Sequence, residues 1–506
     1  MPDLSRRDVL KLMSVAPLAL LTQPLARRSR PAAGGGAHNI ILVVFDAWSA
    51  AHMRMYGYPR QTMPNLQQFA EKAVVYHRHY SAGTFTVPGT ASLLTGLHPW
   101  SHRALALGGE IVSKHREHQV FRLFSPTHFT LGYSQNEFAD LLLSEARRDL
   151  SQHISASRFS LHRDLTYSSS ILQNDAQAAY AAFENGIFQH KVGPDASLFL
   201  GPLRRLMQWR AVNALTAEYR MTYPRGLPAA TDLFLLEDAV DGAIELLGNL
   251  PAPSLVYLHL YPPHGEYRPK GKFNHSFEDG WKAPLKPEHP LIAIPKQYGD
   301  QENQRWKYDE YLASWDAEVA RLLHFLGASG LLDTSYVIFT SDHGELFERG
   351  VIGHYCPLIY DPLVHIPLII SPPGRTERVD VRTATSSVDL LPTIASMAGL
   401  EAPTWAEGSL LPGFGGTADE GRSIYSMDAK DNSAFAGLNK LSMSLTKNNH
   451  RLTYYHHPDA DYEDFELYDL LEDPEELSDL WPAGSPMAAP LKEELLQKLS
   501  DIDRAV

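Results

Sequence analysis

The chain has 506 residues, of which 44% are hydrophobic, so it can bury a large core and exceeds the usual size of one domain. Its formal net charge of −14 comes from 59 acidic and 45 basic residues spread along the sequence, which argues against a surface for nucleic acid or anionic membranes. The single cysteine, Cys356, excludes an intrachain disulfide, a cysteine zinc site and an iron–sulfur cluster. Any bound metal must therefore use oxygen and imidazole ligands.

Residues 1–37 are expected to form an export signal and linker. Paired arginines, Arg6 and Arg7, precede an apolar stretch at residues 12–21 that is too short to span a bilayer as a stable helix. This pattern is typical of a signal read by the twin-arginine translocation machinery, and it predicts a periplasmic or other extracytoplasmic location. A basic helix with a buried apolar face is the alternative. No membrane span is expected after the N-terminal segment. The cleavage site of that segment is a poor match, so retention of the segment as an anchor stays an alternative.

Buried strands are predicted at residues 39–46, 255–260 and 336–342, each an apolar run with polar residues at its C-terminal end. Helical patterns at residues 63–72 and 308–326 lie between them. This alternation predicts an α/β fold with a large, mostly parallel sheet flanked by helices. Because such sheets bind ligands outside the carboxyl ends of their strands, we expect Asp46, His264 and Asp342 to converge.

The sheet domain is expected to span residues 38–400. Within it, residues 144–250 are helical and mixed in composition, and we interpret them as an insertion that either covers the site or forms an ordinary surface layer. Turn-rich sequence follows residue 400, so residues 401–506 are predicted to form a smaller α+β subdomain.

The first candidate site combines Asp342 and His343, which follow the third strand, with Asp46, which ends the first. An adjacent Asp and His alone are equally well explained as a loop salt bridge or cap. Asp46 adds weight, because a carboxylate at the end of a buried strand is costly unless a metal or hydrogen bonds compensate. The three residues together predict a metal site.

The second candidate site lies at residues 84–96, where hydroxyl residues surround Pro88 and Gly89 before an apolar helical start. The simpler interpretation is that Thr86 or Thr90 caps the helix. The functional interpretation is that Thr86 is a nucleophile activated by a metal and aimed at an anion held by the helix N-terminus.

These and further pieces, in this order and spacing, resemble the sulfatase family of the alkaline phosphatase superfamily. The resemblance covers about residues 39–480 and is poorest at residues 144–250. The matching segments are residues 41–46, 56–59, 62–66, 88–96, 263–264, 308–309 with Asp316, 340–345, 353–354, 367–370, 388–393 and 466–470 with 473–474.

The chain departs from the family's pattern where it matters for chemistry. Sulfatases carry at the position of Thr86 a Cys or Ser that is converted to formylglycine, and at the position of Thr90 an Arg. The family's second N-terminal aspartate is replaced by Ala47, its Lys-Trp-His stretch by residues 136–138, and its usual Asn by His343. These changes resemble the superfamily's phosphodiesterases and phosphotransferases, which use an unmodified Thr, so no formylglycine is expected.

The resemblance implies one divalent metal held by Asp46, Thr86, Asp342 and His343. This oxygen and nitrogen set suits Mn²⁺ or Zn²⁺ better than Ca²⁺ or Mg²⁺. It also implies catalytic roles for His264 at the transferring group and for His354 near the leaving group. Weaker matches make His102, Asn136 and His259 candidates for substrate binding. Asp361 and His365 are not assigned, because a turn before the next strand explains them.

We therefore expect an exported hydrolase that cleaves phosphate esters of the phosphodiester or phosphonate monoester type through Thr86. A phosphorylated threonine is readily hydrolysed by in-line water, whereas a sulfated threonine cannot collapse to an aldehyde as a formylglycine hydrate does. The expected substrate is a small-molecule or a glycan- or lipid-derived ester. The alternatives are a sulfuric ester hydrolase without formylglycine and a non-catalytic binding protein that kept the fold; a membrane-bound transferase fits less well.

Overall fold

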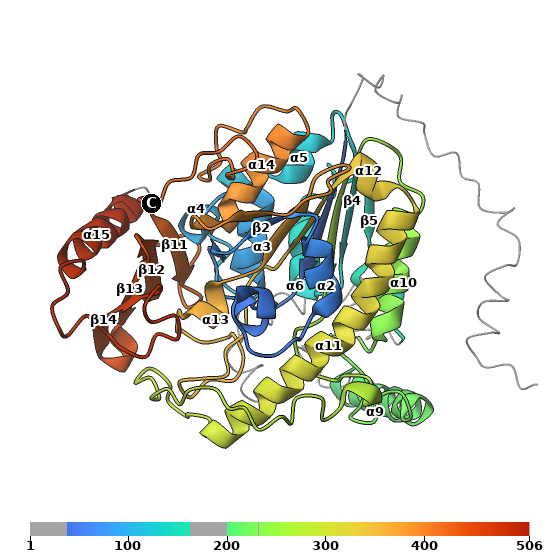
Figure 1. Ribbon diagram of the computed structural model, residues 1–506, viewed down its shortest axis with the longest axis horizontal. Helices are drawn as coiled ribbons and strands as arrows, with labels where there is room; N and C mark the ends of the chain where they lie inside the picture. Colours follow the sequence, from blue (N-terminus) through green and yellow to red (C-terminus); the bar gives the residue numbers. More distant parts are fainter. Residues whose placement is uncertain (1–37, 162–199, 231, 505–506) are drawn as a thin grey trace, which may run out of the picture. The chain divides into compact units, whose positions relative to one another are not determined.

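The computed structural model describes residues 38–161, 200–230 and 232–504, so the expected export signal and linker at residues 1–37 lie outside the described part of the chain. Its largest element is an eight-stranded sheet in the order β5-β4-β6-β1-β7-β8-β2-β9 (Figure 1). The strands are β1 (Asn39–Phe45), β2 (Val74–Tyr76), β4 (Phe129–Ser134), β5 (Gln152–Ile154), β6 (Ser254–Leu260), β7 (Ser335–Thr340), β8 (Leu368–Ser371) and β9 (Val379–Val381).

The central strand β1 pairs in parallel with β6 on one side and β7 on the other. The strand β8 is antiparallel to both of its neighbours, and the other strands share one direction. All seven residues of β1 are buried, as expected of a strand covered on both faces. The predicted mostly parallel α/β sheet is confirmed.

Alternate residues of β1 enter two separate cores, one on each face of the sheet. Ile41, Val43 and Phe45 pack with α2 (Pro64–Ala70), α10 (Leu236–Leu247) and α11 (Tyr298–Ala328). Ile40, Leu42 and Val44 face the opposite core. The helices of that core are α3 (Thr86–Thr95), α5 (Val120–Phe124), α6 (Glu137–Glu145) and α14 (Leu390–Met397). The sheet is thus the middle layer between two sets of helices (Figure 1).

Parts of residues 144–250 belong to the sheet domain itself. The strand β5 pairs with β4 at the edge of the sheet, and α10 buries an apolar face in the core beside α11. The long helix α9 (Leu200–Tyr219) is the described piece that fits the expected helical layer, and residues 162–199 lie outside the described part. Both β5 and α10 thus lie within the range expected for the insertion and are part of the sheet domain.

The remaining short elements connect the sheet domain. They are β3 (His79–Tyr80), β10 (Thr385–Ser386), α4 (Pro99–His102), α12 (Leu331–Thr334), α13 (Asp361–Val364) and the 3-10 turns at Ala50–His52, Arg54–Tyr56, Ser113–His115, Ala156–Phe159, Gly271–Phe273 and Ser387–Asp389; a further 3-10 turn, Pro458–Ala460, joins two strands of the C-terminal part. The strands β3 and β10 pair with each other in a two-stranded sheet.

The C-terminal part forms a four-stranded antiparallel sheet with one helix. It contains β11 (Ile424–Asp428), β12 (Leu441–Lys447), β13 (His450–His457), β14 (Tyr462–Asp469) and α15 (Ala488–Arg504). The backbone N–H of Met427 donates to the carbonyl of Ala82 at 2.9 Å, so β11 is bonded to the segment that leads into α3. This smaller α+β unit agrees with the predicted fold class.

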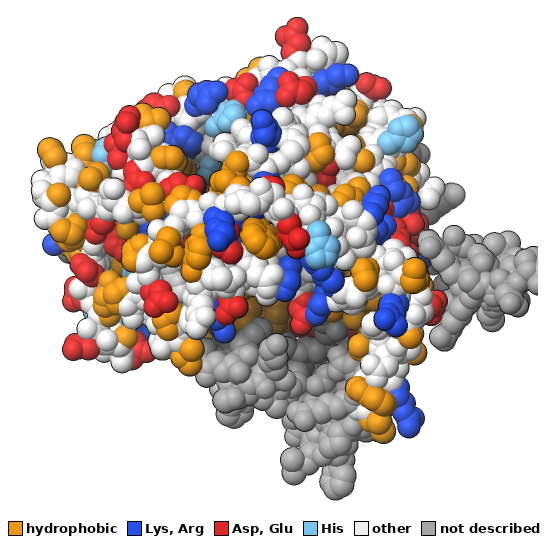
Figure 2. All heavy atoms as spheres, turned by 60° about the horizontal axis from the view of Figure 1, so that its bottom comes forward, with side chains coloured by type: hydrophobic (Ala, Val, Ile, Leu, Met, Phe, Trp, Pro, Cys, Tyr) orange, Lys and Arg blue, Asp and Glu red, His pale blue; other side chains and the backbone are white. Residues whose placement is uncertain are grey.

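The described residues include no helix that is both long and apolar enough to cross a bilayer. On the face shown in Figure 2, acidic and basic side chains are intermingled rather than gathered into a field of one sign. This pattern gives no electrostatic footprint for a polyanion on that face.

Candidate active site at the carboxyl ends of three strands

The three central strands bring Asp46 and Asp342 together because they are parallel and in register. Val44 pairs with His259 of β6 and with Thr340 of β7, and each aspartate follows two residues later. The turns after the strands are joined by Ser341, whose Oγ lies 2.6 Å from the Phe45 carbonyl oxygen and 2.9 Å from the backbone nitrogen of Trp48, which donates to it. The register of the neighbouring strands and the bonds of Ser341 thus fix the positions of both carboxylates.

Asp46, Asp342 and His343 are fully buried and form a group in which one ligand atom from each lies within 4.8 Å of the others. The Nε2 atom of His343 is 3.4 Å from Asp46 Oδ1 and 3.6 Å from Asp342 Oδ2. A tetrahedron of ligands at zinc distances has edges of about 3.3–3.6 Å. The spacing therefore fits ligands that face a common ion.

The hydrogen bonds of these residues orient the ligand atoms toward one another. His343 Nδ1 lies 2.9 Å from the carbonyl oxygen of Gly344, which can only accept, so Nδ1 carries a proton and Nε2 is the nitrogen that can bind an ion once it is deprotonated. Asp46 Oδ1 and Asp342 Oδ2 are buried without a hydrogen-bond partner in the protein. Two unpaired buried carboxylate oxygens are costly, and a divalent cation would compensate them. The residues present fit a metal.

Thr86 stands beside this cluster at the first position of α3. Its Oγ1 lies 3.4 Å from His343 Nε2, and the helix is preceded by Phe85, so no hydroxyl caps its N-terminus. Gly89 allows this approach, because a Cβ at that position would lie 2.3 Å from the carbonyl oxygen of Asp342. The interpretation of Thr86 as a helix cap is therefore not supported, and its hydroxyl faces the cluster.

Asn136 links the cluster of Asp46, Asp342 and His343 to Thr86. Its Oδ1 accepts from the backbone of Phe138 at the start of α6, which fixes the orientation of the amide. Its Nδ2 then donates to Asp46 Oδ2 at 2.6 Å and to Thr86 Oγ1 at 3.3 Å. Asn136 matches the family pattern only loosely in the sequence, but its amide donates to both Asp46 and Thr86.

His264 and His354 lie on the open side of His343. The ring centroids of His264 and His354 are 4.7 Å apart, and those of His343 and His354 are 4.3 Å apart. Glu345 Oε1 lies 2.9 Å from His354 Nδ1, so it orients that ring. Burial lowers the pKa of His264 to about 4 and raises that of Glu345 to about 7. Sequence reasoning had placed Glu345 in the motif without a role.

Two other histidines have different surroundings. His259 is fully buried, and its Nε2 lies 3.3 Å from Asp46 Oδ2. His102 instead bonds within its own neighbourhood: its Nε2 is 3.1 Å from Ser92 Oγ, and its Nδ1 accepts from the backbone of Ala104. Both ring nitrogens of His102 thus have partners, Ser92 and Ala104, outside the cluster of Asp46, Asp342 and His343. No hydrogen bond among the described residues joins His102 to that cluster.

The unassigned pair Asp361 and His365 also has its own partners. His365 Nδ1 is 2.9 Å from Asp361 Oδ2, and Arg451 donates to the other oxygen of Asp361. These bonds connect α13 to β13 of the C-terminal sheet.

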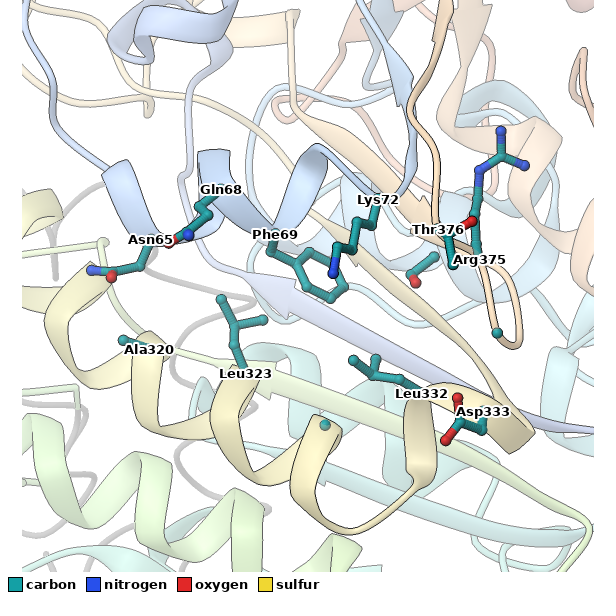
Figure 3. A pocket seen from close by; sticks show the side chains of 13 residues that line it. Asn65, Gln68, Phe69, Lys72, Ala320, Leu323, Leu332, Asp333, Arg375 and Thr376 are labelled. Atoms are coloured by element: carbon teal, nitrogen blue, oxygen red, sulfur yellow. The ribbon is translucent and has the colours of Figure 1, made fainter.

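A hollow of about 520 Å³ lies elsewhere on the sheet domain, between α2, α11 and residues 371–376 (Figure 3). Lys72, Leu323 and Arg375 are among the residues that line it. It shares no residue with the buried cluster, so the candidate site is defined by the side chains at the strand ends.

Comparisons with known proteins agree with this arrangement. The family profile described as Sulfatase matches residues 38–400, and the profile described as N-sulphoglucosamine sulphohydrolase, C-terminal, matches residues 353–505. The chain is 24% identical to the multifunctional alkaline phosphatase superfamily protein PehA of Trinickia caryophylli, over 92% of this chain and 96% of that protein. It is 30% identical to arylsulfatase K of Xenopus laevis, over 40% of this chain and 39% of that protein.

Solved structures show the same fold. The phosphonate monoester hydrolase from Silicibacter pomeroyi aligns with a TM-score of 0.63 at 19% identity, covering 93% of this chain and 96% of that one. The phosphonate monoester hydrolase of Agrobacterium radiobacter also aligns with a TM-score of 0.63, at 18% identity over 92% and 95% of the two chains. With the family profile covering residues 38–400, the chain belongs to the sulfatase family, within the alkaline phosphatase superfamily, and is a hydrolase of that superfamily.

Proposed function

We propose that the protein hydrolyses phosphoric or phosphonic esters, of the phosphodiester or phosphonate monoester type, with Thr86 as the nucleophile. The observation that carries this proposal is the position of Thr86 Oγ1, which lies 3.4 Å from His343 Nε2 and 3.3 Å from Asn136 Nδ2 at the start of α3. A threonine at the nucleophile position has no aldehyde form, and its phosphate ester can be cleaved by in-line water. The names of PehA and of the two phosphonate monoester hydrolases support this reaction class.

Asp46, Asp342, His343 and the Thr86 hydroxyl would hold one divalent metal, with Mn²⁺ or Zn²⁺ best suited to the mixed oxygen and nitrogen donors. Such an ion supplies positive charge that lowers the pKa of a hydroxyl and offsets charge on the phosphoryl oxygens. No formylglycine is required.

The remaining steps, which are attack on phosphorus, protonation of the leaving group and hydrogen bonding to the phosphoryl oxygens, are assigned to side chains of the protein. The Thr86 proton passes to solvent as Oγ1 forms a bond to phosphorus and the bond to the leaving oxygen breaks. Burial lowers the pKa of His264 and of His354 in the free protein. The negative charge of a bound ester would raise both pKa values again, so that His354 or His264 gains a proton and gives it to the leaving oxygen. Asn136 Nδ2 donates to the oxygens around phosphorus. Water then attacks phosphorus in line, Thr86 regains its proton, and the phosphate or phosphonate leaves.

The charge of the site favours a singly charged phosphoryl group. Thr86 Oγ1 and the aspartate oxygens accept hydrogen bonds from the Asn136 amide and from the backbone N–H groups of Ala47 and His343, which are all neutral. Such donors match a phosphodiester or phosphonate monoester, which carries one negative charge, better than a dianionic phosphomonoester. A small-molecule or a glycan- or lipid-derived ester of this charge is the proposed substrate.

The test compares metal-reconstituted wild-type protein with Thr86→Ala and Thr86→Ser on aryl phosphodiester, phosphonate monoester, phosphomonoester and sulfate substrates that share one leaving group. We expect the first two substrates to give the highest kcat/KM, Thr86→Ala to lower it by about 10³-fold or more, and Thr86→Ser to keep most of it. Ser92→Ala, which removes another hydroxyl from α3, is the matched control. A preference for sulfate that survives Thr86→Ala would contradict the mechanism, and turnover of no ester would favour a binding protein.

Export by the twin-arginine route is the second part of the proposal. It is supported by Arg6 and Arg7 before the apolar stretch at residues 12–21. Replacing both arginines by lysine is expected to leave the protein in the cytoplasmic fraction of a bacterial host, whereas wild-type protein reaches the periplasm. Equal export of both forms would contradict this route.

A further inference from the structure

His259 lies in the sheet, on β6, beside the cluster formed by Asp46, Asp342 and His343. It pairs with Val44 across β6 and β1, and it is fully buried. Its Nε2 lies 3.3 Å from Asp46 Oδ2 and 3.6 Å from Asp342 Oδ2, so one ring nitrogen faces both carboxylates. The group whose ligand atoms all lie within 4.8 Å contains Asp46, Asp342 and His343 but not His259. His259 Nε2 is thus close to both carboxylates without being close to all three members of that group.

The other nitrogen of His259 has a fixed partner. The Tyr257 hydroxyl lies 2.9 Å from Nδ1, and burial raises the pKa of Tyr257 well above its ordinary value, so the phenol keeps its proton. A lone pair on Nε2 would face two carboxylates, whereas an Nε2–H attracts them. The favoured tautomer accepts from Tyr257 at Nδ1 and carries its proton on Nε2.

Thr90 leaves room for this pair. It is fully buried in α3 and lies against the Tyr257 hydroxyl. A long cationic side chain at position 90 would compete for the same space, and the short threonine leaves that space to Tyr257 and His259. On the side of α3 and β6, the side chain that faces both carboxylates is therefore the imidazole of His259.

We propose that His259 is a positioning residue, which holds the carboxylates of Asp46 and Asp342 in ligand geometry through its Nε2–H and is itself oriented by Tyr257. This inference rests on the metal site of the proposed function. It assigns His259 to the support of the metal ligands and not to contact with substrate. Groups that orient metal ligands in this way typically contribute about 10- to 100-fold to metal affinity.

The test measures metal binding, so it does not depend on turnover. Apo forms of the wild type, His259→Leu, His259→Gln and Tyr257→Phe are titrated with Mn²⁺ by calorimetry, and the Co²⁺ forms are compared by their d–d absorption. We expect His259→Leu to weaken Mn²⁺ binding by about 10- to 100-fold, and His259→Gln, which keeps an N–H, to lose less. The Co²⁺ band positions should stay those of the wild type in each variant, because no ligand is lost.

His457→Gln is the matched control. His457 is a buried histidine of the C-terminal sheet whose Nε2 lies 2.9 Å from Ser442 Oγ, and its replacement should leave Mn²⁺ affinity unchanged. If His259→Leu fails to fold, Tyr257→Phe carries the test with an expected loss of about 3- to 10-fold.

Two results would overturn the proposal. Folded His259→Leu, or Tyr257→Phe in its place, could bind Mn²⁺ as tightly as the wild type, which would remove the supporting role. Alternatively, the Co²⁺ bands could shift in both His259 variants with no recovery by glutamine, which would make His259 a metal ligand. A protein that binds Mn²⁺ as expected but cleaves no phosphorus ester would contradict the proposed function and leave this inference standing.

Discussion

The charges of Asp46, Asp342 and His343 control when the site can take up a metal. Burial lowers the pKa of His343, but the carboxylates of Asp342 and Asp46 outweigh that effect and raise it to about 9 in the metal-free protein. Burial and the charge of Asp46 raise the pKa of Asp342 to about 6. A metal must therefore displace a proton from His343 at neutral pH, and a second one from Asp342 in acid.

This competition predicts the pH dependence of metal binding. Between about pH 6 and pH 9 the affinity for Mn²⁺ is expected to rise about tenfold per pH unit, with about one proton released per ion, and to level off above the pKa of His343. Calorimetry in buffers of different ionisation enthalpy counts the released protons.

His343→Asn is the control for that prediction, because asparagine keeps an oxygen ligand but has no proton to lose. Its affinity should depend little on pH between 6 and 9. A slope that persists in His343→Asn would assign the proton to another group.

The same charges make the stability of the metal-free protein depend on pH in the opposite direction to metal binding. The pKa of His343 is higher in the folded protein than its ordinary value of 6.5, so its charged form stabilises the apo protein fully below pH 6.5. That contribution is lost as the pH rises through about 9. Metal should therefore raise the melting temperature most in alkaline solution, which thermal unfolding with and without Mn²⁺ can measure.

At the scale of elements, the site depends on how closely α3 approaches the turn after β7. Gly89→Ala would place a Cβ 2.3 Å from the Asp342 carbonyl oxygen, so the helix or the turn must shift. We expect a loss of about 1–3 kcal/mol in the free energy of unfolding, together with weaker Mn²⁺ binding. Urea unfolding and calorimetry measure the two effects.

Gly299→Ala provides the comparison, because Gly299 lies in α11 with open space where a Cβ would be. Its stability should stay within about 1 kcal/mol of the wild type, with unchanged metal binding. Equal effects at both positions would show that the contact with Asp342 is not the cause.

The sequence predicted the central elements because the strands that are covered on both faces read as unbroken apolar runs. It located Asp46, Thr86, Asp342 and His343 for the same reason, since they follow such runs or start the next helix. It could not place β5 in the sheet or α10 in the core, because the mixed composition of residues 144–250 hides which faces are buried.

The supporting side chains were harder to predict than the ligands. The roles of Ser341 and Tyr257 depend on the register of neighbouring strands, which a single sequence does not specify. His259 and His102 match the family pattern equally loosely in the sequence. In the structure His259 faces Asp46, whereas His102 bonds to Ser92. Only the three-dimensional arrangement separates them.

At the scale of the whole molecule, Arg451 joins the C-terminal sheet to the sheet domain. It is fully buried, donates to Asp361 and to Glu476 at 2.8 Å each, and lies over the ring of Tyr80. Arg451→Leu would remove the cation shared by the Asp361 and Glu476 carboxylates, although Asp361 keeps His365 and Glu476 keeps the backbone N–H of Asp361. We expect it to lower the free energy of unfolding by about 3–5 kcal/mol. Urea unfolding followed by tryptophan fluorescence measures the loss.

Arg116→Leu is the matched control, since Arg116 is half exposed and pairs with the exposed Glu110. Arg116→Leu should lower the free energy of unfolding by less than about 1 kcal/mol. If Arg451→Leu costs no more than this control, the buried network does not hold the two parts together.

The bond between Thr84 and Asp428, at 2.9 Å, has a consequence for the order in which the protein is made. Thr84 leads into the helix that carries Thr86, and its partner is synthesised 344 residues later. A growing chain on the ribosome therefore cannot complete this site until most of its sequence has emerged. If residues 1–37 direct the protein across a membrane only after it has folded, an ion bound during folding would come from the cytoplasm rather than from the destination.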